Sequence, residues 1–368
     1  MALNQGNVLA RGARVAGGII CVVLIAAEII WIGRDIGNVG VKDTFLTWIG
    51  RIFSGQQHAP LGTSITDVIL VVIYLGALLA AAQPIASGAF VTAGVLTLLY
   101  RLPLLWILTE DETRGLHLRD RALYTAIGAV LAAVALIVVA AAGRRPVVSP
   151  ADGEPPAPPR TGPAIFGGLL LMFLALASVA WEAYYIQHFT SDRMGPFSYW
   201  RQFTGKQPSG VLLAPPGFWV DWVVIVLCVV AAVQAFARKP VARPLGMALG
   251  WLLAAYAVFT LDIYAKQKML FEFGDLDTTD ILQQLTSVVE VVVGILIILL
   301  LALRGTHRPP VVPAWGAPGG QYGAWGAPPA PAPYNDAPYG QSPFGGPPPL
   351  PPEYPPNTPP RPQTPPGW

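Results

Sequence analysis

Hydrophobic residues come in long blocks along the chain, separated by short stretches that hold most of the charges. A helix that spans a bilayer needs about 20 mostly apolar residues, because the hydrocarbon core is about 30 Å thick and a helix rises about 1.5 Å per residue. The sequence therefore predicts an all-α polytopic membrane protein with about eight transmembrane helices. The eight blocks are residues 15–33, 66–83, 86–108, 122–143, 164–186, 217–237, 244–264 and 283–303.

The two halves of the chain resemble each other. At an offset of 154 residues the segment around Glu28 matches the segment around Glu182, and the apolar run that begins at Asp67 matches the run that begins at Asp221. A loop motif, Arg-x-Phe-(Ser/Thr)-Gly-x-Gln, recurs at an offset of 150 residues. This duplication predicts two tandem four-helix repeats of the same orientation, related by a pseudo-twofold axis along the membrane normal. The motif residues are Arg51, Phe53, Gly55 and Gln57, and Arg201, Phe203, Gly205 and Gln207.

Composition supports the membrane assignment and divides the chain into regions. Hydrophobic residues make up 53% and charged residues only 12%, whereas charged residues are about a quarter of an ordinary soluble protein. Of the 38 prolines, 22 follow Arg308, and such a composition cannot build a packed core. We expect a first membrane repeat over 1–143, a Pro-rich cytoplasmic linker over 144–163, a second repeat over 164–303, and a disordered Pro/Gly/Tyr-rich cytoplasmic tail over 304–368.

The basic residues orient the predicted spans. Basic residues without a matching number of acids lie before the first block, after the fourth, after the sixth and after the eighth, all on one side of the membrane, whereas the loops on the opposite side carry mixed charge. Because Lys and Arg are enriched in cytoplasmic loops, both termini of this multi-pass cell-membrane protein are predicted to be cytoplasmic. The richness in Arg, Ala and Pro is typical of a GC-rich bacterial genome. A net charge of +2 without a basic stripe argues against a nucleic-acid partner and leaves the lipid bilayer as the expected partner.

Acidic residues inside or at the ends of the predicted spans are the candidate functional groups. A charge at mid-bilayer costs about 2.5–3.5 kcal/mol on insertion scales and less toward the interface. The acids therefore form a cation or proton site in an outward-facing vestibule, or they make interhelical hydrogen bonds that fix packing. For Asp67 and Asp221 we favour capping of a helix start. The six acids, all predicted toward the extracytoplasmic side, are Glu28, Glu182, Asp67, Asp221, Glu290 and Asp262.

Arg101 is the one basic residue well inside a predicted span. We expect it to pair with Glu28 or Asp67 as a counter-ion, or else to extend its head group to the outer interface. The second half carries Ala255 near the corresponding position, so the two halves are predicted to differ in charge.

The loop motif lies outside the predicted spans. Its first copy follows an amphipathic stretch that begins at Val41, which suits a helix in the plane of the interface. Two interpretations remain: an aromatic anchor in the headgroup region, or a lid over a central cavity.

No motif of an enzyme or of a cofactor site is present, so neither catalysis nor a cofactor is expected. His58, His117 and His188 lack the spacing of helical metal ligands, and we predict no metal site. One function hypothesis is a secondary transporter or channel-like protein with acidic residues in an outward-facing cavity. The alternative is a non-transporting membrane scaffold or sensor whose tail, through a polyproline II segment at 347–352, recruits a protein partner. The sequence specifies no substrate.

Overall fold

The computed structural model describes residues 7–48, 61–147, 154–189, 198–206, 211–274 and 276–305. These residues belong to one compact unit, Met1–Pro309. Almost all of the predicted tail, including its polyproline segment, lies outside the described residues, so its disorder and its partner stay predictions.

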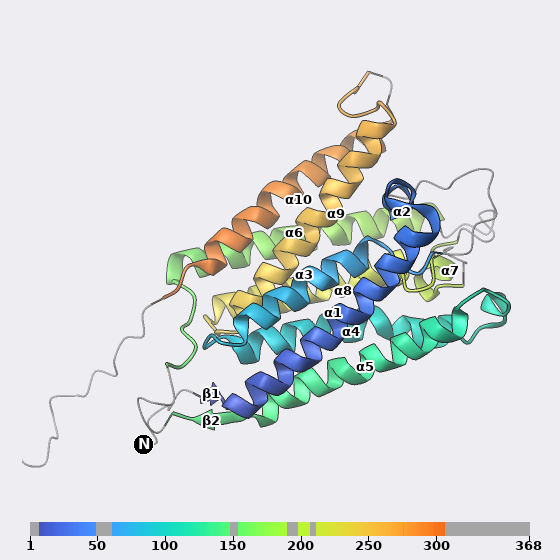
Figure 1. The fold of residues 1–368 in the computed structure, drawn as a ribbon. Helices are drawn as coiled ribbons and strands as arrows, with labels where there is room; N and C mark the ends of the chain where they lie inside the picture. Colours follow the sequence, from blue (N-terminus) through green and yellow to red (C-terminus); the bar gives the residue numbers. More distant parts are fainter. Residues whose placement is uncertain are drawn as a thin grey trace, which may run out of the picture. The chain divides into compact units, whose positions relative to one another are not determined.

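The described residues are mostly helical (Figure 1). Two short strands, β1 and β2, pair antiparallel, with Val8 opposite Arg145. In chain order the elements are β1 (Asn7–Leu9), α1 (Arg11–Val39), α2 (Val41–Trp48), α3 (Ile65–Ala80), α4 (Ala86–Ile107), η1 (Asp111–Thr113), α5 (Arg119–Ala142), β2 (Arg144–Pro146), α6 (Thr161–Phe189), α7 (Tyr199–Thr204), α8 (Gly217–Phe236), α9 (Ala242–Lys266) and α10 (Thr278–Ala302).

Seven of these helices are long and apolar enough to cross a membrane, which indicates a multi-pass membrane protein. They are α1, α4, α5, α6, α8, α9 and α10. The second of the eight predicted spans, residues 66–83, is not among these helices and needs correction. Its helix, α3, has 16 residues and is therefore only about 24 Å long, shorter than a hydrocarbon core. The helix ends at Ala80, ahead of the turn that contains Pro84.

Helix α3 nevertheless runs between the two ends of the helical bundle. We call these the α7 end, where α2 and α7 lie, and the β end, where β1 and β2 lie (Figure 1). The segment before α3 starts at the α7 end. The turn after it reaches the β end, where Arg14 donates a hydrogen bond of 3.4 Å to the carbonyl of Ala82. The chain therefore crosses the bundle once through α3 and this turn.

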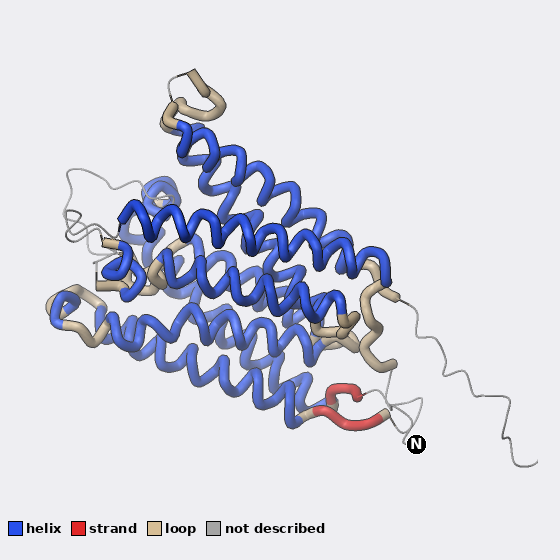
Figure 2. The backbone as a smooth tube through the Cα atoms, turned by 180° about the vertical axis from the view of Figure 1, so that it is seen from behind, coloured by secondary structure: helices blue, strands red, loops and turns tan. Residues whose placement is uncertain are grey.

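The long helices form two groups with corresponding contacts (Figures 1 and 2). In the first group, α1 and α4 each contact both α3 and α5. In the second group, α6 and α9 each contact both α8 and α10. Helix α9 also contacts α3 and α4, and so joins the groups.

Glycines allow the closest helix pairs to approach. A Cβ atom built on Gly250 of α9 would lie 2.6 Å from the carbonyl oxygen of Gly294 on α10, and one on Gly94 of α4 would lie 2.8 Å from that of Ala133 on α5. Backbone atoms cannot move aside as a flexible side chain can. Glycine is therefore required where these helices touch.

Two extended segments link the groups at the α7 end. The amide of Leu212 donates to the carbonyl of Leu61, and that of Leu213 to Gly62, each at 2.9 Å. The buried carboxylate of Asp35 holds the first segment, because it accepts hydrogen bonds from the amides of Gly62 and Thr63. Asp35 was predicted to lie in a loop, but α1 continues past residue 33 to Val39.

We predict that Gly250→Ala lowers the melting temperature of the purified protein in detergent by several degrees, because the added methyl group meets the backbone of α10. Gly128→Ala in α5 is the matched control, since a Cβ atom there meets nothing within 4 Å. Equal melting temperatures for the two variants would contradict this packing.

Candidate functional site

The first helix group contains a fully buried ionic cluster. The guanidinium of Arg101, on α4, donates from Nη2 to Glu28 Oε1 at 2.6 Å and to Asp67 Oδ1 at 2.5 Å. Its Nη1 donates to the carbonyl of Leu213 at 2.6 Å. The cluster thus joins α1, α3 and α4 to a segment that leads into the second group.

Burial distinguishes between the two interpretations of Arg101. Its side chain is 0% exposed, so it does not extend to an interface but pairs with both candidate carboxylates. Asp67 has a second role, since its Oδ2 accepts the backbone amide of Ser64 at 2.5 Å in a capping box at the start of α3. A guanidinium between two carboxylates compensates one of their two negative charges, and the hydrogen bonds from Arg101 and from the Ser64 amide further stabilise the buried carboxylates.

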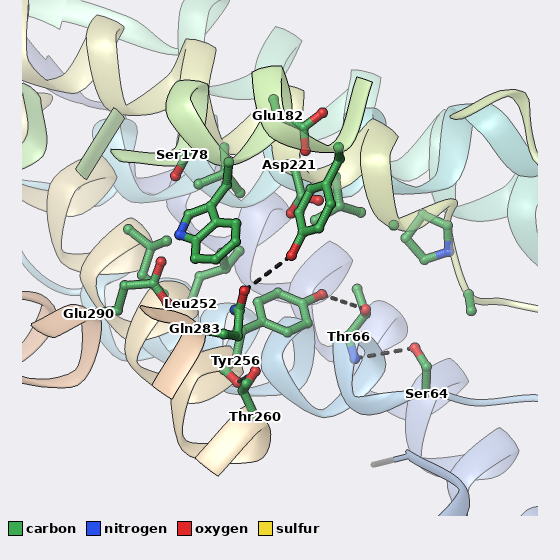
Figure 3. A pocket seen from close by; sticks show the side chains of 18 residues that line it. Ser64, Thr66, Ser178, Glu182, Asp221, Leu252, Tyr256, Thr260, Gln283 and Glu290 are labelled. Atoms are coloured by element: carbon green, nitrogen blue, oxygen red, sulfur yellow. Dashed lines mark hydrogen bonds between the residues drawn. The ribbon is translucent and has the colours of Figure 1, made fainter. Parts of the chain in front are cut away.

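The second group contains a cavity of about 410 Å³ in place of such a cluster (Figure 3). Three carboxylates line it: Glu182 from α6, Asp221 from α8 and Glu290 from α10. Aromatic side chains and neutral polar groups complete the wall. These are Trp181, Tyr185 and Tyr256, and Ser178, Thr260 and Gln283. The size suits a small molecule.

Glu182 and Asp221 form a close pair, with Glu290 set apart from them in the cavity (Figure 3). The carboxyl groups of Glu182 and Asp221 are near neighbours in this view. Glu182 accepts a hydrogen bond from the hydroxyl of Tyr199, which in turn accepts one from Trp222 Nε1 at 2.8 Å. Two neighbouring carboxylates repel each other when both are ionised, so a proton held between them, or a cation, stabilises the pair.

Asp221 does not cap its helix, contrary to the prediction. Helix α8 begins at Gly217 with no acidic residue in its first turn, so Asp221 lies one turn inside the helix. Its side chain is exposed although helices surround it, because it faces the cavity. Asp221 is thus open to the cavity, whereas Asp67 in the first group is 0% exposed.

The two groups differ in charge. The first holds two carboxylates and one guanidinium, whereas the second holds three carboxylates, and no Lys, Arg or His occurs among the described residues that line the cavity. A polar contact connects the sites: Tyr256, on the cavity wall, lies 2.7 Å from the hydroxyl of Thr66, the neighbour of Asp67.

The remaining predicted residues lie elsewhere. Asp262, predicted to join the other acids, instead pairs with Lys266 at 2.5 Å, one turn along α9, with both side chains about a third exposed. The first copy of the loop motif and Gln207 lie outside the described residues. In the second copy Gly205 ends α7 with a φ of 74°, and Phe203 contacts Trp219. Arg201 donates to the carbonyl of Lys206.

Sequence reasoning missed the aromatic residues around the carboxylates. Tyr256 lines the cavity and Tyr199 donates to Glu182, but such residues also fill cores, and nothing in their spacing connects them to Thr66 or Glu182. Ser178 lies one helical turn before Glu182 on α6, which was the available signal.

No protein-family model, curated protein or solved structure gives a significant match to this chain. The functional interpretation therefore depends on the geometry alone.

We predict that Arg101→Gln destabilises the folded protein by about 3–5 kcal/mol, because it leaves two buried carboxylates without a counter-charge. Denaturant unfolding in detergent measures this. Arg114→Gln is the control, since Arg114 and its partner Asp111 are 71% and 81% exposed and exposed pairs contribute little. Unfolding midpoints that shift alike in both variants would contradict the role of Arg101.

Proposed function

We propose that this protein is a secondary transporter that exchanges protons for a small cation, with its binding site in the cavity between α6, α8, α9 and α10. The observation that carries the proposal is a cavity with three carboxylates and no basic residue in its described lining. Carboxylates inside an apolar bundle need a compensating charge. Arg101 supplies it in the first group, and solution must supply it in the second.

Two species from solution can supply the compensating charge: a proton or another cation. The pair formed by Glu182 and Asp221 holds a proton when its two carboxyl groups bond to each other. A cation that enters between them breaks this bond and takes over the compensation. Binding of the cation and of the proton therefore compete, which is the condition for exchange.

We further propose that the two helix groups are repeats of one ancestral unit. Two equivalent hydrogen bonds support this: Trp31 of α1 donates to Thr125 of α5, and Trp181 of α6 donates to Thr286 of α10. Helices α1 and α6 each have 29 residues, and both their starts and their ends differ by 150 positions.

The offset changes from one helix pair to the next. The buried residues of α3 and α8 correspond at an offset of 154 residues, which aligns Asp67 with Asp221. Those of α4 and α9 correspond at 156, where Gly94 falls on Gly250. Those of α5 and α10 correspond at 161, where Ala133 falls on Gly294. Insertions in the connecting loops account for such steps.

These offsets revise two pairings made from sequence. At 150 the counterpart of Glu28 is Ser178 rather than Glu182, and at 156 the counterpart of Arg101 is Ala257 rather than Ala255. Glu182 lies one turn beyond Ser178 on the same face of α6, and for that reason the sequence alone aligned the two glutamates. The second group thus lacks the guanidinium and gains acids at Glu182 and Glu290.

Exchange of protons for cations is tested in liposomes with the full-length protein in their membrane. Their lumen is acidic and holds a pH-sensitive dye. We expect external small cations to raise the luminal pH with wild type, and Asp221→Asn or Glu182→Gln to reduce the rate at least tenfold. Asp262→Asn, which removes an acid outside the cavity, should keep the wild-type rate. The proposal would be overturned if external cations left the luminal pH unchanged with folded wild-type protein, or if Asp221→Asn kept full activity.

The scaffold hypothesis predicts that removal of the tail abolishes function, whereas the transport proposal predicts that function is kept. We expect a chain that ends at residue 308 to retain cation-driven proton exchange, because the cavity is built within α6 to α10. Loss of exchange on this truncation, in a protein with unchanged thermal stability, would favour a function that depends on the tail.

A further inference from the structure

The ionic cluster of the first group occupies the place that the cavity occupies in the second. Asp67 and Asp221 correspond, and so do Glu28 and Ser178, which both face their respective sites. Where α4 carries Arg101, α9 carries Ala257. Ser178 lines the cavity of about 410 Å³, and Ala257 follows the lining residue Tyr256 on α9, so the second group has neither the carboxylate nor the guanidinium of the first.

The first group therefore contains its own example of a bound cation. The head group of Arg101 satisfies two carboxylate oxygens through Nη2 and one backbone carbonyl through Nη1, at 2.5–2.6 Å. A planar guanidinium makes several charge-assisted hydrogen bonds at once, which a spherical ammonium group cannot match.

The walls of the cavity suit the same kind of cation. Asp221 is retained, and Glu182 lies beside it in the lining (Figure 3). The rings of Trp181, Tyr185 and Tyr256 form part of the lining, and guanidinium planes stack on aromatic faces. The three carboxylates do not form a metal site, since no group of three suitable ligands occurs among the described residues.

We infer that the cavity binds a small guanidinium compound, held by Asp221 and Glu182 as Arg101 is held by Asp67 and Glu28. This inference rests on the proposed function and names its substrate class. On binding, the proton shared by Glu182 and Asp221 leaves to solution and the guanidinium takes its place, so the net charge of the site is unchanged.

Calorimetric titration of the full-length protein in detergent tests the inference, with methylguanidinium and methylammonium as probes at concentrations too low to denature. We expect methylguanidinium to bind at least tenfold more tightly and to release a proton, and Asp221→Asn to abolish binding. Methylammonium binding as tightly as methylguanidinium would overturn the inference.

A second test fills the cavity with an engineered arginine side chain. The double variant Ser178→Glu, Ala257→Arg restores in the second group the residues of the first. We expect it to fold with a melting temperature no lower than that of wild type and to lose methylguanidinium binding. Ser178→Glu with Ala257→Met, which has similar bulk without the charge, should melt at a lower temperature. Tight methylguanidinium binding by a folded Arg variant would show that the ligand lies elsewhere.

The two proposals fail in different ways. If methylammonium or an inorganic cation drives proton exchange in liposomes but methylguanidinium neither binds nor exchanges, the guanidinium inference is wrong and the transport proposal stands. If no cation drives exchange in a folded protein, both are wrong.

Discussion

The constraint on which this structure depends is the compensation of charge inside an apolar helical bundle. Glu28 and Asp67 are buried at 2% and 0% exposure, and the guanidinium of Arg101 between them makes this burial tolerable. The same guanidinium reaches the carbonyl of Leu213 and so holds a segment of the second group. Packing of α1, α3 and α4, and the link between the two groups, thus share one ionic centre. Where the second group lacks a guanidinium, its helices leave a cavity lined by three carboxylates.

A fixed charge and an exchangeable one suit different tasks. An internal arginine is always present and always protonated, so the first group is a rigid element that cannot release its cation. Under the proposed function the second group is compensated from solution, and its occupancy responds to proton and cation concentration. Helix α9 contacts both groups, and the hydrogen bond between Tyr256 and Thr66 connects the wall of the cavity to the neighbour of Asp67. Through these contacts, a change of occupant in the cavity would act on the interface of the two groups.

Much of the fold could be predicted from the sequence, because long apolar blocks have few alternatives to membrane helices. The limits of α3 could not, since the position of its end depends on the turn around Pro84 and on packing at the β end. The pairing of Arg101 followed from charge, but its second carboxylate and the carbonyl of Leu213 come from chain segments that only tertiary structure brings together. The cavity was invisible in the sequence, because its wall combines Ser178 and other residues from α6, α8, α9 and α10 that only the tertiary structure brings together. Under the proposed repeat, Glu28 corresponds to Ser178, one turn before Glu182, and helical periodicity makes these two alignments hard to tell apart in the sequence.

The difference in solvent access between the two groups is the claim on which the rest stands, and thiol labelling measures it directly. Ser178→Cys places a thiol on the wall of the cavity, and Thr97→Cys places one beside Tyr74 in the fully buried core of the first group, both in a chain with Cys21 and Cys228 replaced. Both substitutions exchange a hydroxyl for a thiol of similar size. With a small, neutral, water-soluble thiol reagent, we predict rapid modification at position 178 and modification at position 97 only after unfolding. Protection of position 178 in a folded protein, or equal rates at the two positions, would contradict a water-filled cavity in the second group.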